Sequence, residues 1–351
     1  MAIGVAAMAT VVLALDRASG PAVPVMDEPV VPVVRPQVLA ADLVFDAALA
    51  RAATLPRLRS LLITVDGRLA AERYFHGASA ARATNIKSAS KSIVATLVGA
   101  AIDRGHLRDV QQPIGRFFPE YLARQPAKAA ITIEDLITMR SGLETTSNRN
   151  YGRWVQSGNW VRHVLDRPLV DEPGGRMIYS TGSTHLLSAI LTKATGMSTL
   201  AFARQALGQP LGVSFDGWTR DPQGIYLGGN EMAMRPRDML RVGELYLNDG
   251  RVGERQIIPA DWVRTSIEPR TVSRFGDREY GYGWWIRTLA GRPVFYAWGY
   301  GGQFIFIIPS VKTVVAVTSV SDPGTERREH LGAVYDLVEE DIIPVAAAAF
   351  P

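Results

Sequence analysis

The sequence predicts an α+β fold in which an antiparallel sheet is flanked by helices and a mainly helical lobe is inserted into the chain. Three observations carry this prediction. Residues 61–75 give a hairpin signal, because two strand-like runs flank Asp66-Gly67, the pair that a type I′ turn prefers. Residues 105–275 carry mainly helical patterns, and residues 282–319 return to short strand-like runs. Strands from both ends of the chain can therefore join one sheet around the helical insertion.

The expected helices follow from apolar periodicity and from residues that start or stop a helix. Ser88 to Arg104 is apolar on nearly every side, which predicts a helix buried on most of its faces. Thr132 and Asp135 form a capping box ahead of a helix that Gly142 is expected to end. Further helices are expected over 43–53, from Thr184 to Thr195 before Gly196, from Pro236 to just before Gly250, and from Glu326 to Ile342.

The expected strands near the C-terminus are short aromatic or β-branched runs between Gly, Pro and polar turns. They are Tyr282–Arg287, Pro293–Gly299, Gln303–Pro309 and Thr313–Ser319. The predicted domain organisation follows from this order of elements. Residues 39–86 and 278–351 form an α/β lobe with the antiparallel sheet, residues 87–277 form the mainly helical lobe, and a functional site is expected between the two lobes.

Composition excludes several classes of protein. The chain has 351 residues, of which 47% are hydrophobic and 21% charged, and this is ordinary globular composition. A net charge of +4, from 38 basic and 34 acidic side chains, is too balanced to predict a nucleic-acid partner. No cysteine is present, so disulfides, thiol nucleophiles and Cys-ligated metals are excluded. The sequence carries no signal of oligomeric state.

The first 38 residues are expected to lie outside the fold. Ile3 to Leu15 is an apolar run that resembles the core of a signal peptide and is too short for a stable membrane span. Ala22 to Pro36 is rich in Pro and Val and is expected to be an extended linker. Export from a bacterial cytoplasm, to the periplasm or the medium, is the expectation, with a cytoplasmic protein as the alternative.

Ser88-Ala89-Ser90-Lys91 is the first candidate catalytic motif. It opens the most apolar predicted helix, where a spacing of three residues places the Ser88 hydroxyl and the Lys91 amine on one face. Burial would lower the pKa of the amine, so that it could take the proton of the serine hydroxyl. Amides of the first helical turn would favour negative charge on a group bound to Ser88. A surface Ser–Lys pair without a catalytic role is the alternative.

Two later segments hold groups that would complete such a site. Tyr179 lies just ahead of a predicted helix, and its phenol could relay a proton to a leaving group. The run from Trp298 to Gln303 holds glycines before a strand, and glycines let a substrate approach a strand-edge backbone so that an N–H faces an oxyanion. A tyrosine packed in the core and a plain glycine turn are the alternatives.

Together and in this order, the three motifs resemble those of the serine β-lactamase and penicillin-binding-protein-like superfamily. The resemblance is to its class C-like branch, which includes family VIII carboxylesterases and 6-aminohexanoate-dimer hydrolases, and it covers roughly residues 40–345. It implies a β-lactamase/transpeptidase-like fold, and no cofactor is expected. The supporting segments are LLITVDGRLAAERYF (61–75), ITIEDLITMRSGL (131–143), YSTGSTHLLSAILTKATG (179–196), GGNEMAMRPRDMLRVGELYLNDG (228–250), 281–285 and 299–303.

Carried over residue by residue, the resemblance implies an acyl-transfer site for a small-molecule ester or amide. Ser88 is the nucleophile, Lys91 its activating base and Tyr179 the acid/base partner, with Lys91 and Tyr179 treated as one coupled unit. The backbone N–H groups of Ser88 and Gln303 form the oxyanion hole. An acyl-enzyme forms on Ser88, and water hydrolyses it. Substrate contacts are expected at Tyr300, Gly301 and Gly302. Apart from the resemblance, Trp154 belongs to an aromatic group with Tyr151 and Trp160 that is expected to line an acyl pocket, with plain packing as the alternative.

Two departures from the family pattern bear on the substrate. Thr181 stands where classical β-lactamases carry Asn, and Tyr300-Gly301-Gly302 stands where they carry Lys-Thr-Gly. An uncharged phenol in place of that Lys weakens the case for carboxylated substrates, so a small ester or a linear amide is favoured. The alternatives are a β-lactamase or D-stereospecific peptidase, and a catalytically silent relative that binds a ligand.

The remaining candidates receive structural interpretations. The five histidines include no HExxH motif and no pair four residues apart, so no metal site is predicted. His185 lies on a predicted helix and is interpreted as a structural histidine. No serine lies in a G-x-S-x-G elbow, so an α/β-hydrolase arrangement is not supported.

Overall fold

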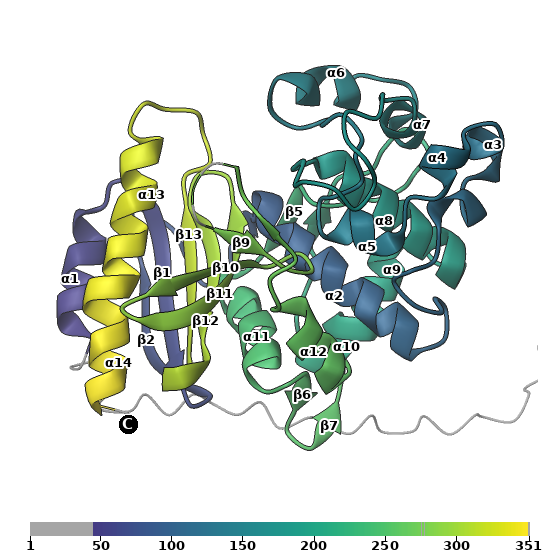
Figure 1. Cartoon of the computed structure of the whole chain (residues 1–351). Coiled ribbons are helices and arrows are strands. Elements are labelled where there is room, and N and C mark those ends of the chain that lie inside the picture. The colour runs from purple at the N-terminus through teal and green to yellow at the C-terminus, as the bar shows by residue number, and fades with distance from the viewer. Residues whose placement is uncertain (1–44, 275, 277, 350–351) are drawn as a thin grey trace, which may run out of the picture. The chain divides into compact units, whose positions relative to one another are not determined.

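An eight-stranded sheet forms the centre of the fold, in a computed structural model that describes residues 45–274, 276 and 278–349 (Figure 1). Its strand order is β2-β1-β13-β12-β11-β10-β9-β8, and each neighbouring pair is antiparallel. β1 (Leu58–Val65) pairs with β13 (Thr313–Ser319), so strands from the two ends of the chain meet as expected. The predicted α+β class is confirmed. The signal-like run and the linker predicted within residues 1–38 lie outside the described residues.

The hairpin and the C-terminal strands lie close to their predicted positions. Asp66 (φ 48°) and Gly67 (φ 72°) both adopt the left-handed conformation that a type I′ turn requires. The remaining strands of the large sheet are β2 (Arg68–Tyr74), β8 (Thr271–Val272), β9 (Glu279–Tyr280), β10 (Trp285–Leu289), β11 (Arg292–Gly299) and β12 (Gln303–Ile308). Small sheets are formed by β3 (Thr84–Asn85), β4 (Gly217–Trp218) and β5 (Met232–Met234), and by β6 (Arg251–Val252) and β7 (Arg255–Gln256).

The longer helices also agree with the sequence, with one correction. They are α1 (Asp46–Thr54), α2 (Ser90–Asp103), α8 (Thr181–Thr195), α11 (Pro236–Leu247) and α13 (Arg327–Asp336), which continues through a π-helical turn into α14 (Ile343–Ala349). The capping box of Thr132 and Asp135 starts α5 (Ile133–Ile137) as predicted. Gly142 does not end that helix. It has φ 73°, and a Cβ there would lie 2.4 Å from the carbonyl oxygen of Asp171, so its role is a close approach of two loop segments.

The short helices lie mostly between α2 and α11 in the chain. They are α3 (Pro119–Leu122), α4 (Pro126–Ala129), α6 (Tyr151–Val155), α7 (Trp160–Leu165), α9 (Thr199–Ala203), α10 (Gln209–Leu211) and α12 (Ala260–Ser266). No single helix in the described part of the chain is long and apolar enough to cross a membrane. The segments Thr181–Thr195 and Thr199–Leu211 pass that test only as a pair, and they are bent by 80° from one another.

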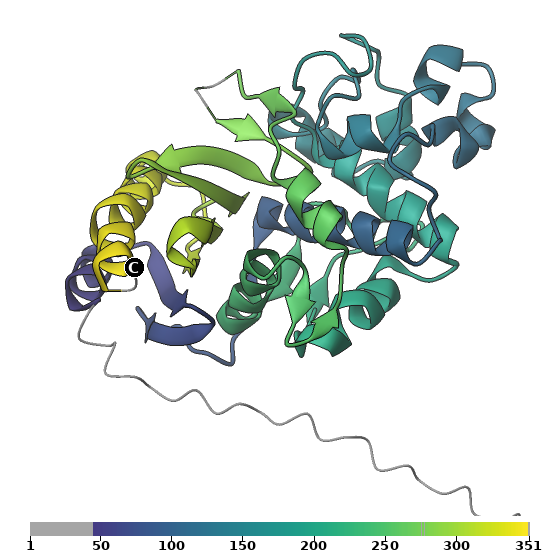
Figure 2. The same cartoon turned by 60° about the horizontal axis from the view of Figure 1, so that its bottom comes forward.

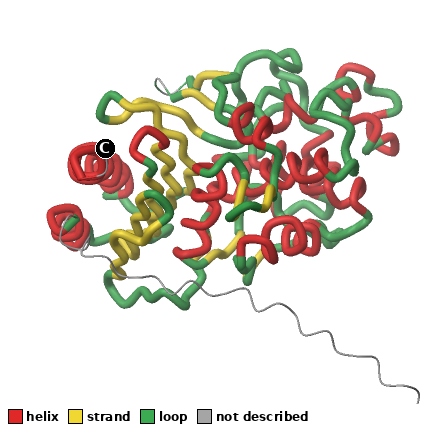
Figure 3. The backbone as a smooth tube through the Cα atoms, turned by 90° about the horizontal axis from the view of Figure 1, so that it is seen from below, coloured by secondary structure: helices red, strands yellow, loops and turns green. Residues whose placement is uncertain are grey.

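The sheet separates two apolar layers. Along β12, Phe304, Phe306 and Ile308 pack on the same side as α1, α13 and α14, while Ile305 and Ile307 face α2, α8 and α11. This alternation is the period of two that a strand buried on both faces imposes on its side chains. Figures 2 and 3 show the layers in cross-section: the first and last helices on one side of the strands and the other helices on the opposite side.

The predicted lobe boundaries remain a prediction, with one difference in the sheet. β8 pairs with β9 in the large sheet. The C-terminal group of strands therefore starts at Thr271, ahead of residue 278, where the second segment of the α/β lobe is expected to begin. The 3₁₀ turn η2 (Lys87–Ala89), which holds Ser88, contacts β11 and β12. The start of α2 therefore lies where the sheet meets the helical part of the chain.

Candidate active site

Lys91 is the centre of a buried polar cluster at the start of α2. Only 2% of the residue is exposed. Its Nζ lies 3.1 Å from Ser88 Oγ, 3.2 Å from Thr181 Oγ1 and 2.7 Å from the carbonyl oxygen of Gly229. The spacing of three residues thus places Ser88 and Lys91 in contact, as the sequence predicts.

Burial favours the unprotonated form of Lys91, which is the form that can act as a base. It lowers the pKa of the Lys91 ammonium from 10.5 to about 7, because the charged form loses its hydration. The three neighbours of Nζ are a carbonyl and two hydroxyl oxygens, none of which carries a formal charge that would restore the cation. A large share of Lys91 is therefore unprotonated at neutral pH.

Tyr179 lies beside Lys91 and is held by aromatic packing. Lys91 Nζ is 5.0 Å from the centroid of the Tyr179 ring. The ring stacks on Trp285 at 5.8 Å and meets Tyr280 edge-on at 6.5 Å. Burial raises the pKa of Tyr179 to about 12, while a hydrogen bond with Ser88 lowers it in part. The phenol is therefore protonated at neutral pH and lies within reach of Ser88.

The N-terminus of α8, which follows Tyr179, is capped by a distant segment. Thr181 N–H donates to Ser147 Oγ at 2.8 Å, and Gly182 N–H donates to Thr146 Oγ1 at 2.9 Å. These two bonds satisfy amides that no side chain of α8 itself reaches. The Ser147 and Thr181 hydroxyls also lie 3.0 Å apart, so a chain of hydroxyls continues from Lys91 away from Ser88.

The turn before Ser88 is strained and held by an ionic cluster. Lys87 has φ 51°, which is unusual for a residue other than glycine. Its N–H donates to Asn85 Oδ1 at 2.9 Å, and its Nζ pairs with Glu231 Oε1 at 3.0 Å. Asn85 Nδ2 donates to the other carboxylate oxygen of Glu231 at 2.6 Å. These contacts fix the backbone conformation from which the Ser88 side chain projects.

The edge predicted to supply the second oxyanion N–H lies against this turn. A Cβ on Gly299, the last residue of β11, would lie 2.0 Å from the carbonyl oxygen of Ile86, so only glycine permits this approach. Gln303 pairs with Gly299 across the two strands. Its side chain is engaged with β13, where Nε2 donates to the Ser319 carbonyl at 2.7 Å and Oε1 accepts from the Ser319 N–H at 3.1 Å. The role predicted for the Gln303 backbone N–H stays a prediction.

The residues predicted to contact substrate occupy different environments. Tyr300 is 40% exposed, with the Arg327 guanidinium 4.5 Å above its ring. Gly301 and Gly302 have φ 89° and 107°, and Cβ atoms there would crowd Val320, Ser321, Ser319 and His330. Packing against the chain therefore explains these two glycines without a substrate.

Trp154 is fully buried, so the substrate contact predicted for it is wrong. Its indole packs against Trp160 and His185, and its Nε1 donates to the Trp160 carbonyl at 3.1 Å. A side chain enclosed in this way presents no surface to a substrate. The alternative interpretation, plain packing, accounts for this residue.

Sequence reasoning missed Gly229 as part of the site. Gly229 has φ 83°, and a Cβ there would lie 2.7 Å from Lys91 Cγ and 3.0 Å from Nζ. Only glycine can therefore bring its carbonyl to the amine. The available signal was the Gly228-Gly229 pair at the start of a family-like segment. Among the described residues, no three His, Asp or Glu side chains gather as a metal site requires.

Comparisons with known proteins identify the family of this chain. The beta-lactamase family model matches residues 58–339. A 6-aminohexanoate-dimer hydrolase of Paenarthrobacter ureafaciens is 26% identical over 264 residues, which cover 68% of this chain and 67% of that protein.

Two solved structures show the same fold at low identity. The hydrolase EstCE1, described as having promiscuous acyltransferase activity, matches with a TM-score of 0.67 and 18% identity, covering 84% of this chain and all (100%) of the other. The octameric penicillin-binding protein homologue of Pyrococcus abyssi matches with a TM-score of 0.63 and 18% identity, covering 85% and 76%.

The family model covers most of the chain, and this identifies the class of protein. The chain belongs to the beta-lactamase family. It is a serine hydrolase with a β-lactamase/transpeptidase-like fold, as the sequence motifs predict.

Proposed function

We propose that the protein cleaves a small carboxylic ester or a linear amide through an acyl-enzyme on Ser88, with Lys91 as base and Tyr179 as proton donor. The observation that carries the proposal is the buried amine of Lys91, in contact with Ser88 Oγ at 3.1 Å. A lysine without a carboxylate partner is costly to bury, and activation of a nucleophile is a function that explains the cost.

The neighbours of Lys91 support a defined orientation of its lone pair. The Gly229 carbonyl can only accept, so one N–H of the unprotonated amine points to it. The Thr181 hydroxyl accepts a second N–H if its own proton is donated to Ser147 Oγ, 3.0 Å away. The lone pair is then left for the Ser88 O–H, which is the direction that deprotonation of the nucleophile requires.

The proposed steps balance within this set of groups. Ser88 Oγ attacks the substrate carbonyl carbon while its proton moves to Lys91 Nζ, and the backbone N–H groups of Ser88 and Gln303 stabilise the oxyanion. The Tyr179 phenol donates its proton to the leaving oxygen or nitrogen as that bond breaks, and Lys91 returns a proton to Tyr179. Water then attacks the acyl-enzyme, with the same groups acting in reverse.

The proposed substrate class rests on the residue at position 300 and on the relatives. Tyr300 presents a phenol where classical β-lactamases present a lysine, which favours substrates without a carboxylate at that position. A similar protein is named as a hydrolase of the 6-aminohexanoate dimer, whose scissile bond is a linear amide. An ester or a linear amide is therefore preferred over a β-lactam.

The decisive test is hydrolysis of p-nitrophenyl butyrate by the purified protein and by Ser88→Ala. We expect turnover that Ser88→Ala lowers by about a thousandfold or more, and labelling of Ser88 by an active-site phosphonate located by mass spectrometry. Ser90→Ala is the matched control, because this hydroxyl donates to the Lys87 carbonyl instead of contacting Lys91. Equal rates for Ser88→Ala and the wild type would contradict the proposal. Faster turnover of a chromogenic cephalosporin than of esters and linear amides would contradict the substrate class.

A further inference from the structure

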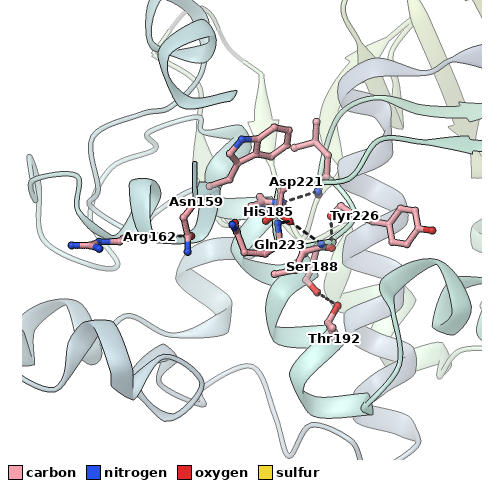
Figure 4. A network of polar contacts seen from close by, with 12 residues as sticks. Asn159, Arg162, His185, Ser188, Thr192, Asp221, Gln223 and Tyr226 are labelled. Carbon is pink, nitrogen blue, oxygen red and sulfur yellow. Dashed lines mark hydrogen bonds and ion pairs between the residues drawn. The ribbon is translucent and has the colours of Figure 1, made fainter. Parts of the chain in front are cut away.

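A second buried polar pair lies one helical turn beyond Thr181 on α8. His185 and Asp221 both have fully buried side chains, and His185 Nε2 lies 3.1 Å from Asp221 Oδ2 (Figure 4). The rings of Trp154 and Trp160 pack on His185 at 5.6 Å each, so the pair is enclosed by apolar surface. A buried carboxylate in such surroundings needs donors, and its remaining contacts show where they come from.

Asp221 organises the loop that leads to Gly229. Its Oδ1 accepts the backbone N–H groups of Gln223 and Ile225, both at 2.8 Å, and its own N–H donates to the Ile225 carbonyl at 2.8 Å. The carboxylate is thus shared between a tight loop through one oxygen and His185 through the other. Its contact with His185 therefore ties this loop to α8.

Residues 226–228, which follow in this loop, each form a hydrogen bond with a neighbouring element. Ser188 Oγ donates to the Tyr226 carbonyl at 2.6 Å, and Trp218 Nε1 donates to the Leu227 carbonyl at 2.8 Å. The Gly228 N–H then donates to His185 Nδ1 at 3.4 Å. A Cβ on Gly228 would lie 2.1 Å from the Thr184 carbonyl oxygen, so this segment lies directly on the backbone of α8. The residue that follows is Gly229, whose carbonyl accepts from Lys91.

The tautomer of His185 is fixed by its two partners. The Gly228 N–H can only donate, so Nδ1 must be the acceptor, and the proton of the ring must then lie on Nε2, where it is donated to Asp221. A carboxylate at Asp221 is therefore required for His185 to accept from Gly228.

We infer that His185 and Asp221 are positioning residues for catalysis, because they hold the Gly228–Gly229 peptide so that the Gly229 carbonyl meets the Lys91 amine. This inference rests on the proposed function of Lys91 as a base. The carbonyl occupies one N–H of Lys91 and so helps direct the lone pair to Ser88. Neither His185 nor Asp221 touches Ser88 or the amine itself, so their effect passes through the Gly229 carbonyl.

Asp221→Asn is the sharpest test, because it changes the hydrogen-bond polarity and almost nothing of the shape. Two backbone N–H groups require an oxygen at the Oδ1 position, so the new amide nitrogen must face His185. The ring can then keep its contact only by accepting at Nε2, which moves its proton to Nδ1 and sets two donors against each other at Gly228. We expect kcat to fall about tenfold to a hundredfold with little change in KM, and the acidic limb of the pH profile of kcat/KM to move by about half a pH unit or more.

Three further variants separate positioning from a loss of folded protein. His185→Asn keeps an acceptor near the Nδ1 position, and we expect it to retain more activity than His185→Gln, which keeps only the donor to Asp221. Thr195→Val removes a hydroxyl at the C-terminal end of the same helix, where its partners are Leu191 and Met197, and its acidic limb should coincide with that of the wild type. His185→Gln replaces Asp221→Asn if the latter does not fold.

The outcomes distinguish this inference from the proposed function. A pH profile of Asp221→Asn that is lowered but unmoved, with the wild-type Ser88 still labelled by the phosphonate, overturns the positioning role alone. A wild type that shows neither turnover nor labelling overturns the proposed function and this inference together. A moved acidic limb, with partial recovery in His185→Asn, supports the positioning role.

Discussion

The Lys91 cluster and the His185–Asp221 pair are both buried beside α8, but they differ in the partners that they give to a buried ionisable group. Lys91 is surrounded by oxygens that carry no formal charge, and burial lowers its pKa to about 7. The Asp221 carboxylate receives two backbone N–H groups and the His185 ring, which together satisfy both of its oxygens. The comparison teaches that a buried group kept without a counter-charge is suited to move a proton, whereas a buried group with a full set of donors is suited to hold a backbone in place.

Among the variants that test this comparison, replacement of Lys91 should have the largest effect on activity. Lys91→Met keeps the volume of the stem and removes the base, so we expect kcat/KM for an aryl ester to fall by about 10² to 10⁴. In the wild type, activity should rise with pH through about 7, because the reactive form of Lys91 is the unprotonated amine. That acidic limb should be absent from the residual activity of Lys91→Met.

The control for this prediction is another lysine. Lys193 forms a surface ion pair with Glu120 at 2.7 Å, and Lys193→Met should keep its rate and its pH profile. A Lys91→Met protein as active as Lys193→Met would show that the buried amine has no part in catalysis.

The pH dependence of stability should show the cost of burying Lys91. Its folded-state pKa of about 7 lies below the ordinary value of 10.5, so between these pH values the unfolded chain binds more protons than the folded one. Stability of the wild type relative to Lys91→Met should therefore rise as pH increases from 7 to 10, by up to about 4 kcal/mol. Urea unfolding of both proteins at the two pH values measures this difference. A difference that stays constant with pH would mean that Lys91 keeps its ordinary pKa in the folded state.

The smallest expected effect is at Gly229, which links the Lys91 cluster to the loop held by the His185–Asp221 pair. Gly229→Ala places a methyl group 2.7 Å from Lys91 Cγ at a φ of 83°, and we expect a loss of stability of about 1–3 kcal/mol together with a lower kcat. Gly77→Ala is the matched control, since Gly77 has φ 77° with no atom within 4 Å of the added Cβ and belongs to neither cluster. Both variants carry the same backbone strain, and only the first should alter the rate of ester hydrolysis. Equal rates in the two would separate Gly229 from the site.

Local sequence signals determined a large part of the fold. The Asp66-Gly67 turn, the capping box of Thr132 and Asp135 and the Gly196 terminus of α8 act within a few residues, and each lies where the pattern predicts. The run of aromatic and aliphatic residues along β12, between glycines and Pro309, likewise predicted a strand without knowledge of its partners. The Ser88–Lys91 contact belongs to this group, because a spacing of three residues at a helix start is itself local.

Only the tertiary structure decided which distant groups surround these residues. Gly229 lies 138 positions from Lys91, and the hydroxyls that cap α8 come from a segment about 35 residues earlier. The burial that enclosed Trp154 and lowered the pKa of Lys91 depends on the packing of many elements at once, and no single stretch of sequence carries that information. The sequence alone thus placed Ser88 and Lys91 in contact at the start of a helix, and the packing of distant loops determined the electrostatics around them. The physical reason is range: turns and caps act between neighbours in the chain, whereas desolvation depends on every atom that excludes water.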